Sequence, residues 1–148
     1  MKIRPAEPAD RDDWLRMRHD LWPLPPGENE GNHAEDIDAY FAGFRSGLIL
    51  VADMEPGIVG FLELGSRDYA EGCGSSPVAY VEGWWVDEEH RASGVGRALI
   101  EAACDWARDE DFSEIASDAE WDNEGSQAAH LAVGFEEADR VVCFRKTL

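Results

Sequence analysis

The segment from Arg91 to Gly96, Arg-Ala-Ser-Gly-Val-Gly, places an arginine and two glycines where a strand is expected to give way to a helix. The first backbone N–H groups of a helix have no partner within the helix, and the helix dipole favours an anion beside them. Gly94 and Gly96 lack a Cβ, so a phosphate could approach the backbone closely. Arg91 and Arg97 add charge and forked donors. The segment therefore predicts a phosphate-binding loop.

The same residues are also compatible with an ordinary turn and helix cap, because a lone Arg-x-x-Gly-x-Gly is a short pattern. No Gly-Lys-Ser/Thr follows it, so it is not a P-loop. Leu99 stands where the third glycine of a dinucleotide-binding fingerprint belongs. The surrounding sequence has to decide between the two interpretations.

Two carboxylates are candidate ligands for a cation. Glu82 lies inside the apolar stretch VAYVEGWWV, where an ionised acid is costly unless a cation or a hydrogen bond compensates it. Asp118 ends the next expected strand, so both acids could face one cleft if the two strands are neighbours. The residues alone leave open a satisfied core acid for Glu82 and a turn cap for Asp118.

Composition narrows the class of protein. The 148 residues include 32 acids against 13 bases, for a net charge of −19, and 44% are hydrophobic. This balance argues against nucleic acid as a partner, because phosphates need the opposite charge. It would attract a polycation, although it also fits simple solubility or a salt-adapted surface. No apolar run approaches the about 20 residues that a membrane helix needs, so no membrane partner is expected.

Three widely spaced cysteines, Cys73, Cys104 and Cys143, suggest neither a disulfide framework nor a metal site. We interpret them as structural and expect no metal. Their number fits a reducing cytoplasm, and the charged N-terminus is unlike a signal peptide.

Hydrophobic periodicity and turn residues predict a single α/β domain over 1–148, with a mixed sheet and the order β-α-α-β-β-β-α-β-α-β. Strands are expected at 2–5, in a hairpin over 48–66 that turns at Glu55-Pro56-Gly57, and at 78–87, 112–119 and 140–147. Helices are expected from Asp10 as N-cap to about Leu21, over 34–47, after the glycine loop and over 122–135; a loop is expected over 22–33.

Buried faces of the helices follow from apolar spacing. The expected members are Trp14, Met17, Leu21 and a snorkelling Arg18 in the first helix; Ile37, Phe41 and Phe44 in the second, which Gly47 would end; Val95, Leu99, Ala102, Ala103 and Trp106 in the third; and Gly134 as the end of the fourth.

Arg91, Gly94 and Gly96 after a strand, followed by Asn123, Ser126, His130, Gly134 and Phe135, make the chain resemble the Gcn5-related N-acetyltransferase (GNAT) family. The resemblance implies the GNAT fold, with a mostly antiparallel sheet and splayed central strands, and acetyl-coenzyme A as cosubstrate. It implies that the backbone from Arg91 through Ala92, Ser93, Gly94, Val95 and Gly96 to Arg97 holds the pyrophosphate. It also implies that Trp84, Trp85 and Val86 lend backbone to the pantetheine arm and that Asn123 contacts coenzyme A.

A narrower resemblance rests on SRDYAEGCGSSPVAYVEGWWVD at 66–87, with DLWP at 20–23 and GFEEADRVVCFRK at 134–146. These segments are similar to aminoglycoside 6′-N-acetyltransferases, whereas 24–60 matches poorly. The resemblance implies an aminoglycoside substrate held by Trp22, Tyr69, Glu82, Asp118 and Asp139. Two positions depart from it: Asp139 replaces a glutamate, and His130 stands where many members of the wider family carry a tyrosine.

The expected chemistry is direct attack of the 6′-amine on the thioester in a ternary complex. Glu82, directly or through a water, would accept the proton of the ammonium. The N–H of Val86 would stabilise the oxyanion, and His130 could protonate the departing thiolate. A polyamine or peptide amine as acceptor, and a coenzyme A sensor without activity, are the alternatives. A homodimer paired through the last strand is expected.

Overall fold

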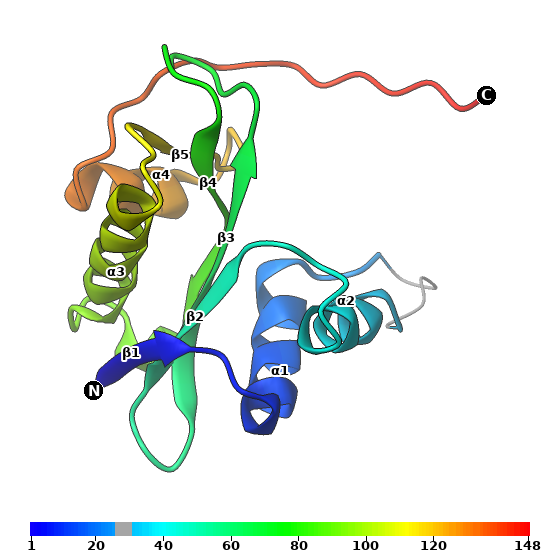
Figure 1. The fold of residues 1–148 in the computed structure, drawn as a ribbon, viewed down its shortest axis with the longest axis vertical. Helices are drawn as coiled ribbons and strands as arrows, with labels where there is room; N and C mark the ends of the chain where they lie inside the picture. Colours follow the sequence, from blue (N-terminus) through cyan, green and yellow to red (C-terminus); the bar gives the residue numbers. More distant parts are fainter. Residues whose placement is uncertain (26–30) are drawn as a thin grey trace.

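The computed structural model describes residues 1–25 and 31–148, and its centre is a five-stranded sheet in the order β1-β2-β3-β4-β5. Neighbouring strands run antiparallel except for β4 and β5, which run parallel. The strands are β1 (Lys2–Pro5), β2 (Leu48–Asp53), β3 (Ile58–Arg67), β4 (Val78–Val86) and β5 (Ile115–Ser117). Figure 1 shows this strongly twisted sheet along the middle of the molecule.

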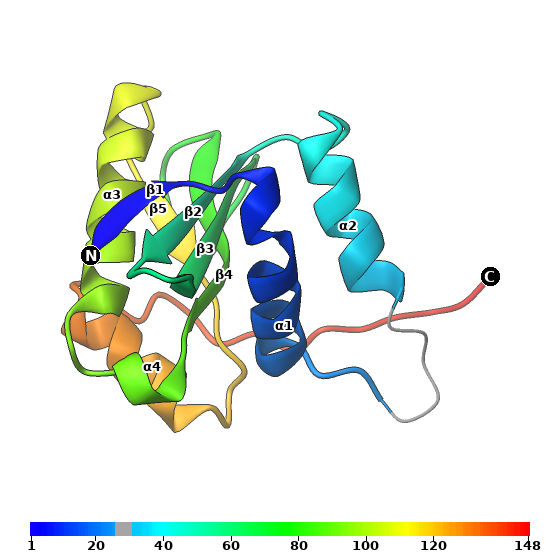
Figure 2. The same cartoon turned by 90° about the horizontal axis from the view of Figure 1, so that it is seen from below.

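Helices cover both faces of the sheet (Figure 2). The helices α1 (Arg11–Leu21) and α2 (Gly31–Phe41) lie on one face, and α3 (Val95–Asp109) lies on the other with α4 (Glu124–Ala132) beside it. Short 3-10 turns, η1 (Pro8–Asp10) and η2 (Glu88–His90), precede α1 and α3. None of the helices in the described residues has the length and apolar character needed to cross a bilayer.

Two hydrophobic cores, one on each face, hold the layers together. The core under α3 contains Leu50, Ala52, Leu62, Leu64, Val81, Val86, Val95, Leu99, Ile100 and Ala103. The core under α1 and α2 contains Trp14, Met17, Ile37, Ile49, Val51, Ile58 and Phe61. The apolar faces expected for the first and third helices are confirmed by Trp14, Met17, Val95, Leu99 and Ala103, which are buried. Leu21, Ala102 and Trp106 are partly buried against the same cores.

The parallel strands β4 and β5 stay together for only three residue pairs, from Ala79 opposite Ile115 to Val81 opposite Ser117. Beyond that point β4 continues to Val86, while β5 has ended. The expected splay between the central strands is thus present, and it leaves one side of the last part of β4 open.

The second helix ends earlier than predicted. It stops at Phe41, and Gly43, not Gly47, provides the left-handed residue after it, with φ of +82°. The N–H of Gly43 bonds to the carbonyl of Tyr40 and that of Phe44 to the carbonyl of Ala39, which is the Schellman pattern. Phe44 consequently lies beyond the helix and is 86% exposed, so its expected place on the buried face is wrong.

The final predicted strand, 140–147, does not form. After α4 the chain runs away from the sheet (Figure 1), and Val141, Val142 and Phe144 are exposed. Sequence pattern indicates only β propensity, whereas a strand also needs a neighbour to pair with its backbone. The strand expected over 112–119 is shorter than predicted and is limited to β5. Part of the loop expected over 22–33 lies outside the described residues.

Arg18 is buried rather than snorkelling to the surface. Its Nε lies 3.1 Å from Oε1 of the buried Glu63, and its Nη atoms bond to Asp36. The indole N–H of Trp14 donates to the same Glu63 oxygen at 3.1 Å. Burial raises the pKa of Glu63, while Arg18 opposes that shift. The buried carboxylate needs a counter-charge, which keeps the guanidinium inside.

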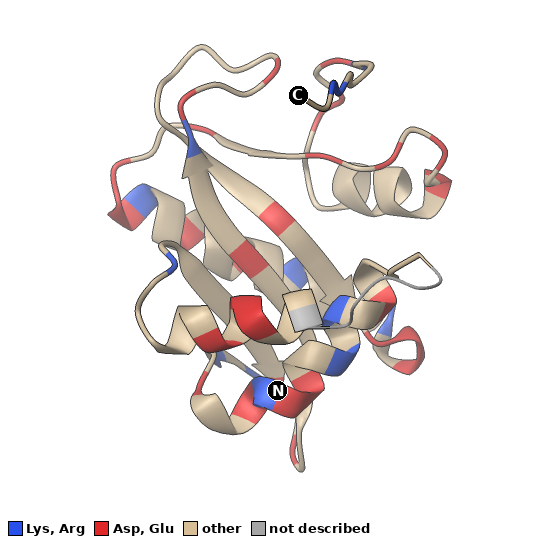
Figure 3. Ribbon diagram, turned by 90° about the vertical axis from the view of Figure 1, so that its right-hand side faces the viewer, with Lys and Arg blue, Asp and Glu red and all other residues tan. Residues whose placement is uncertain are grey.

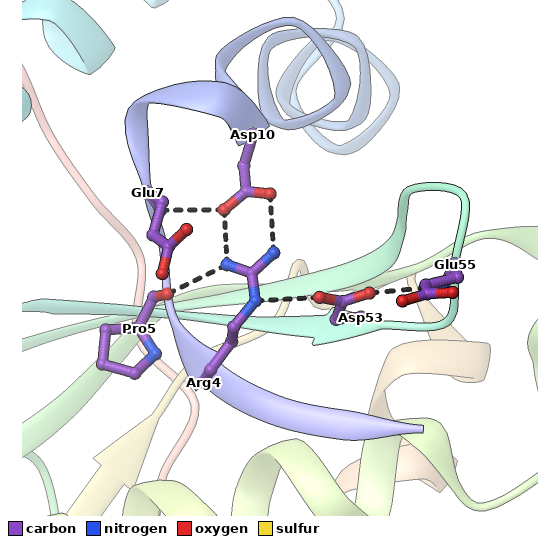
Figure 4. Close-up of polar contacts among 6 residues, drawn as sticks. All are labelled: Arg4, Pro5, Glu7, Asp10, Asp53 and Glu55. Carbon is purple, nitrogen blue, oxygen red and sulfur yellow. Dashed lines mark hydrogen bonds and ion pairs between the residues drawn. The ribbon is translucent and has the colours of Figure 1, made fainter.

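Arg4 joins β1, β2 and the start of α1 (Figure 4). Its two Nη atoms donate to the carboxylate of Asp10 at 2.7 and 2.9 Å, and its Nε donates to Asp53 at 2.9 Å. Asp10 was expected to cap the helix, but its carboxylate accepts from Arg4 and from the N–H of Glu7 and makes no cap bond to α1. The Arg4 hydrogen bond holds the pKa of Asp10 below its usual value.

We expect Asp10→Asn to lower the free energy of unfolding at pH 7 by about 1–3 kcal/mol, because a buried charge-assisted pair is lost. The lowered pKa means that this stabilisation is present above the ordinary carboxyl value of about 3.9 and disappears as pH falls through the folded value. Urea unfolding at pH 7 and pH 2 should therefore show the full difference from the wild type at pH 7 and a smaller one at pH 2. Asp12→Asn, on the exposed side of α1, is the control. An equal difference at both pH values would contradict the assignment.

Candidate active site

A β-bulge in β4 sets the direction of Glu82. In the pairing with β3, Gly83 lies opposite Glu63 and Val81 opposite Leu64, so Glu82 is an extra residue without a partner. A bulge re-aims the side chains that follow it. Gly83 and Glu82 therefore both face the side of the sheet that carries α1 and α2. Figure 3 views the sheet from the side of α1 and α2 and marks acidic positions along both long strands.

Four side chains meet where β3 ends and β4 and β5 run together. Arg67 donates to both carboxylate oxygens of Glu82, from Nε at 3.0 Å and from Nη2 at 2.6 Å. The same Nη2 lies 3.9 Å from Oδ2 of Asp118, and the guanidinium lies over the Tyr80 ring at 3.6 Å. The Tyr80 hydroxyl donates to Asp118 at 2.7 Å. The two predicted acids are thus brought together around a cation.

These contacts exclude the alternative, left open by the sequence, that Glu82 is a buried core acid. The Glu82 side chain is 39% exposed, and its charge is balanced by Arg67. Sequence reasoning missed Arg67 and Tyr80 altogether. Both residues lie in the 66–87 segment that carries the narrower resemblance. Their contact depends on the register of β3 against β4, in which Arg67 lies opposite Val78. A spacing rule does not supply that register.

Trp22 lies on the same face as Glu82, next along β4. A Cβ added to Gly83 would come within 2.5 Å of the Trp22 ring, so only glycine lets the indole lie directly on the strand. The Trp22 carbonyl bonds to Nε2 of the buried His33 at 3.0 Å, and the Arg18 guanidinium lies 5.1 Å from the ring centroid. The structure therefore holds the Trp22 ring on the face of β4 that carries Glu82.

Tyr69 and Asp139 lie at the rim. Tyr69 is 70% exposed in the loop after β3. The C-terminal segment crosses this loop, because a Cβ on Gly72 would lie 2.6 Å from that of Ala138. The Asp139 carboxylate accepts from the N–H of Arg140. Within the described residues neither side chain hydrogen-bonds to the Glu82–Asp118 pair, so the structure places them near one another but does not join them to it.

The glycine loop opens onto the start of α3. Ala92 and Gly94 have φ of +58° and +93°, and Gly94 directly precedes the first helical residue, Val95. A Cβ on Gly94 would meet no atom within 4 Å, whereas one on Gly96 would lie 2.9 Å from the Trp84 ring. Gly96 thus lets α3 approach β4. The first N–H groups of α3 have no acceptor within the helix and no side-chain cap. These donors suit an anion such as a pyrophosphate.

The hydrogen bonds of Arg91 and Arg97 go to backbone carbonyls of neighbouring elements. Arg91 donates from Nε to the carbonyl of Val86 at 2.9 Å and lies over the Trp85 ring at 4.6 Å. Arg97 donates from Nη2 to the carbonyl of Ala132 at 2.7 Å. They fasten the loop to β4 and α3 to α4. Each arginine thus has a structural contact in this protein, and the backbone N–H groups at the start of α3 are the donors without an intrahelical partner.

The open edge of β4 exposes backbone groups of alternate residues. The N–H of Asp87 donates to the carbonyl of Val59, its direct neighbour on β3. Because hydrogen-bonded pairs alternate in an antiparallel ladder, Trp85 turns its backbone groups toward β3, and Trp84 and Val86 turn theirs toward the splay. The indole N–H of Trp84 is buried without a hydrogen-bond partner among the described residues. These free donors fit an extended, amide-containing ligand.

The structure therefore combines an open strand edge, a splay after Val81 and a helix start with unpaired N–H groups, and it holds Arg67 between Glu82 and Asp118. Residues 14–135 match the model of the Acetyltransferase (GNAT) family. This chain belongs to the GNAT family.

Relatives within the family are similar over almost their full length. An aminoglycoside N(6′)-acetyltransferase type 1 of Klebsiella aerogenes is 43% identical, covering 99% of this chain and 96% of the relative. One of Stenotrophomonas maltophilia is 40% identical, covering 99% and 93%. The crystal structure of an aminoglycoside 6′-N-acetyltransferase from Acinetobacter haemolyticus superposes with a TM-score of 0.89 at 37% identity, covering 100% and 99%. The structure of AAC(6′)-Iy in complex with the bisubstrate analogue CoA-S-monomethyl-acetylneamine gives 0.88 at 32% identity, covering 99% and 98%.

His130, which replaces the tyrosine of many GNAT members, is bonded through both ring nitrogens. Nδ1 lies 2.7 Å from the carbonyl of Ser126, and Nε2 lies 2.8 Å from the hydroxyl of Ser117. Because a carbonyl only accepts, Nδ1 carries the proton and Nε2 accepts from Ser117 when the ring is neutral. The ring packs edge-on against Trp84 and lies beside Phe135. Ser117 therefore stands between His130 and the splay.

Two other side chains of the expected coenzyme A site serve as local caps. Asn123 accepts from the N–H of Ser126 at the start of α4, and Ser93 donates to the carbonyl of His90. The amide group of Asn123 still has its two N–H donors for a ligand.

The cysteines of this GNAT chain are thiols outside the cluster. Burial raises the pKa of Cys73 and of Cys104, which keeps both neutral near pH 7 and weakens them as nucleophiles. Cys143 lies in the exposed C-terminal segment. Among the described residues, no three or more His, Cys, Asp and Glu side chains gather as a metal site would require.

Proposed function

We propose that this chain is an aminoglycoside 6′-N-acetyltransferase, which moves the acetyl group of acetyl-coenzyme A to the 6′-amine of the antibiotic and so gives resistance. The observation that carries the proposal is the Glu82–Asp118 pair beside the open edge of β4, where a cation already lies between the two carboxylates. Aminoglycosides are polycations, and their amines need such partners. The relatives named above support the same substrate class.

In this proposal the acceptor lies on the face formed by α1 and the bulge of β4. Trp22 and Tyr69 offer aromatic faces to sugar rings and ammonium groups. Glu82, Asp118 and Asp139 supply carboxylates. The net charge of −19 also steers a polycation toward the protein.

Acetyl-coenzyme A is held by backbone from the other side. The N–H groups at the start of α3 receive the pyrophosphate, and the outward backbone groups of Trp84 receive the pantetheine arm. The Val86 carbonyl is already bonded to Arg91, so Val86 offers only its N–H. Trp85 does not join them, because its backbone faces β3 and its side chain packs against the core under α1 and α2. Asn123 contributes its amide. The bound thioester supplies the acetyl group and a thiolate leaving group.

The chemical step needs a proton acceptor and an oxyanion donor. Glu82, directly or through a water, takes the proton from the 6′-ammonium, which frees the amine to attack. The Val86 N–H stabilises the developing oxyanion. In its charged form His130 donates its Nε2–H to the Ser117 hydroxyl. Ser117 then passes its own hydroxyl proton to the thiolate and receives the Nε2 proton, which leaves the ring neutral.

The acceptor is tested by release of free coenzyme A with two matched aminoglycosides, one with a 6′-amine and one with a 6′-hydroxyl. We expect turnover only with the 6′-amine, because the carboxylates position that group. Spermidine and a basic peptide are the controls for the alternative acceptor. Turnover with spermidine or peptide alone would keep the acetyltransferase activity and overturn the aminoglycoside assignment.

Glu82→Gln separates catalysis from binding. As a general base Glu82 should contribute about 10²–10⁴-fold to kcat, so the variant should lose kcat and show a shifted pH profile, with the KM for acetyl-coenzyme A unchanged. Asp118→Asn is the matched comparison and should mainly raise the KM of the acceptor. A rise in KM alone for Glu82→Gln would leave only a binding role, and an unchanged enzyme would exclude both.

We further propose a homodimer in the cytoplasm, where thiols stay reduced. The exposed fractions of Val141, Val142 and Phe144 are 59, 78 and 93%, which is unusual for apolar side chains in strand-like spacing. Pairing this segment with the sheet of a second copy would cover them. Finding the activity outside the cytoplasm on cell fractionation would contradict the proposed location.

The dimer is tested by sedimentation of the double variant Val142→Asp and Phe144→Asp. Each side chain contributes about 1.5–3 kcal/mol when buried, so the variant should sediment as a monomer while the wild type sediments as a dimer. Thr147→Asp controls for the added charge. A wild type that is monomeric at micromolar concentration would overturn the proposal.

A further inference from the structure

Arg67 occupies the position that a substrate ammonium would need. It is the last residue of β3, and its side chain is 43% exposed, so it can leave the cluster without disturbing the core. Yet among the described residues the guanidinium contacts are with groups of the acceptor site: both oxygens of Glu82, one oxygen of Asp118 at 3.9 Å, and the face of Tyr80.

The site beneath Arg67 is rigid and suited to cations. Tyr80 is 3% exposed, and its hydroxyl holds the Asp118 carboxylate. Burial raises the pKa of Tyr80, so the hydroxyl remains a donor at neutral pH. An aromatic face with two carboxylates beside it attracts ammonium as well as guanidinium. The same site therefore accepts either Arg67 or a substrate amine.

We propose that Arg67 is a resident cation of the acceptor site, that a substrate ammonium has to replace it, and that this competition makes the enzyme select acceptors with several ammonium groups. The inference rests on the proposed function and specifies how that site discriminates. A single ammonium exchanges one ion pair with Glu82 for another and gains little. An acceptor with several ammonium groups contacts Glu82 and Asp118 together and outcompetes the one guanidinium.

The test compares neamine, which carries several amines, with 6-amino-6-deoxyglucose, which carries one, in the wild type and in Arg67→Met. Half-exposed ion pairs contribute little, so we expect the variant to lower the KM of the single amine by about two- to five-fold. The KM of neamine should change less, and the preference for neamine in kcat/KM should shrink by the same factor. For an acceptor with slow turnover, its inhibition constant against neamine replaces the KM.

Two further variants keep the comparison specific. Arg108→Met removes the same charge from an exposed pair with Asp105 on α3, and it should leave the preference unchanged. Arg67→Lys restores a cation and should restore most of the preference. The KM of acetyl-coenzyme A should be constant throughout, because its site lies at the start of α3.

A higher KM for both acceptors in Arg67→Met would overturn the inference, since it would mean that Arg67 holds Glu82 in place for the substrate. An unchanged preference would overturn it as well. Failure of the proposed function is distinguishable: a wild type that acetylates spermidine but not neamine refutes the aminoglycoside assignment. In that case the same variants, compared on spermidine and a simple monoamine, still decide the role of Arg67.

Discussion

The separation of β4 from β5 after Val81 is the constraint on which the rest of the site depends. A strand that loses its neighbour has backbone groups that need a partner, and here these groups belong to Trp84 and Val86. The start of α3 adds a second set of unpaired N–H groups to the same opening. In the proposed function, the amides and phosphates of acetyl-coenzyme A are the partners of these groups, except for the Val86 carbonyl, which accepts from Arg91. Ser117, the last residue of β5, marks the fork and bonds to His130.

The bulge at Glu82 determines which face of the sheet the acceptor residues share. Without the bulge, residues 82 and 83 would face opposite sides of β4. Glu82 would then not lie on the same side as Gly83, against which Trp22 packs. One extra residue turns both toward α1 while Trp84 and Val86 stay aimed at the α3 side. The acceptor and the cosubstrate thus approach the same strand from different directions. That arrangement suits a direct transfer between two bound molecules.

Some charged side chains of this protein stabilise the fold, and others are available to a ligand. Its few basic side chains are largely engaged: Arg4 ties strands to the first helix, Arg18 neutralises a buried acid, and Arg91 and Arg97 bond to backbone carbonyls. The acidic surplus is mostly spread over the surface. Among the described residues, Glu82 and Asp118 converge on a half-exposed guanidinium that lies over the Tyr80 ring, and this is the cation that we propose a substrate replaces.

The sequence by itself determined the local elements and the chemical types. Apolar spacing placed α1, the β2–β3 hairpin, β4 and α3, because burial imposes a period on the chain. Gly94 marked the helix start, since few other residues adopt its φ of +93°. The likeness to aminoglycoside acetyltransferases came from the unusual segment at 66–87.

Only the tertiary structure decided what those residues contact. The bulge, the meeting of Arg67 with Glu82 and Tyr80, the burial of Arg18 and the use of Arg91 on a carbonyl all depend on strand register and on neighbours distant in sequence. The last strand failed as a prediction for the same reason: the propensity of 140–147 is local, but a strand exists only when another strand lies beside it. Local patterns record what a segment can form, and packing selects which of its side chains are free to do chemistry.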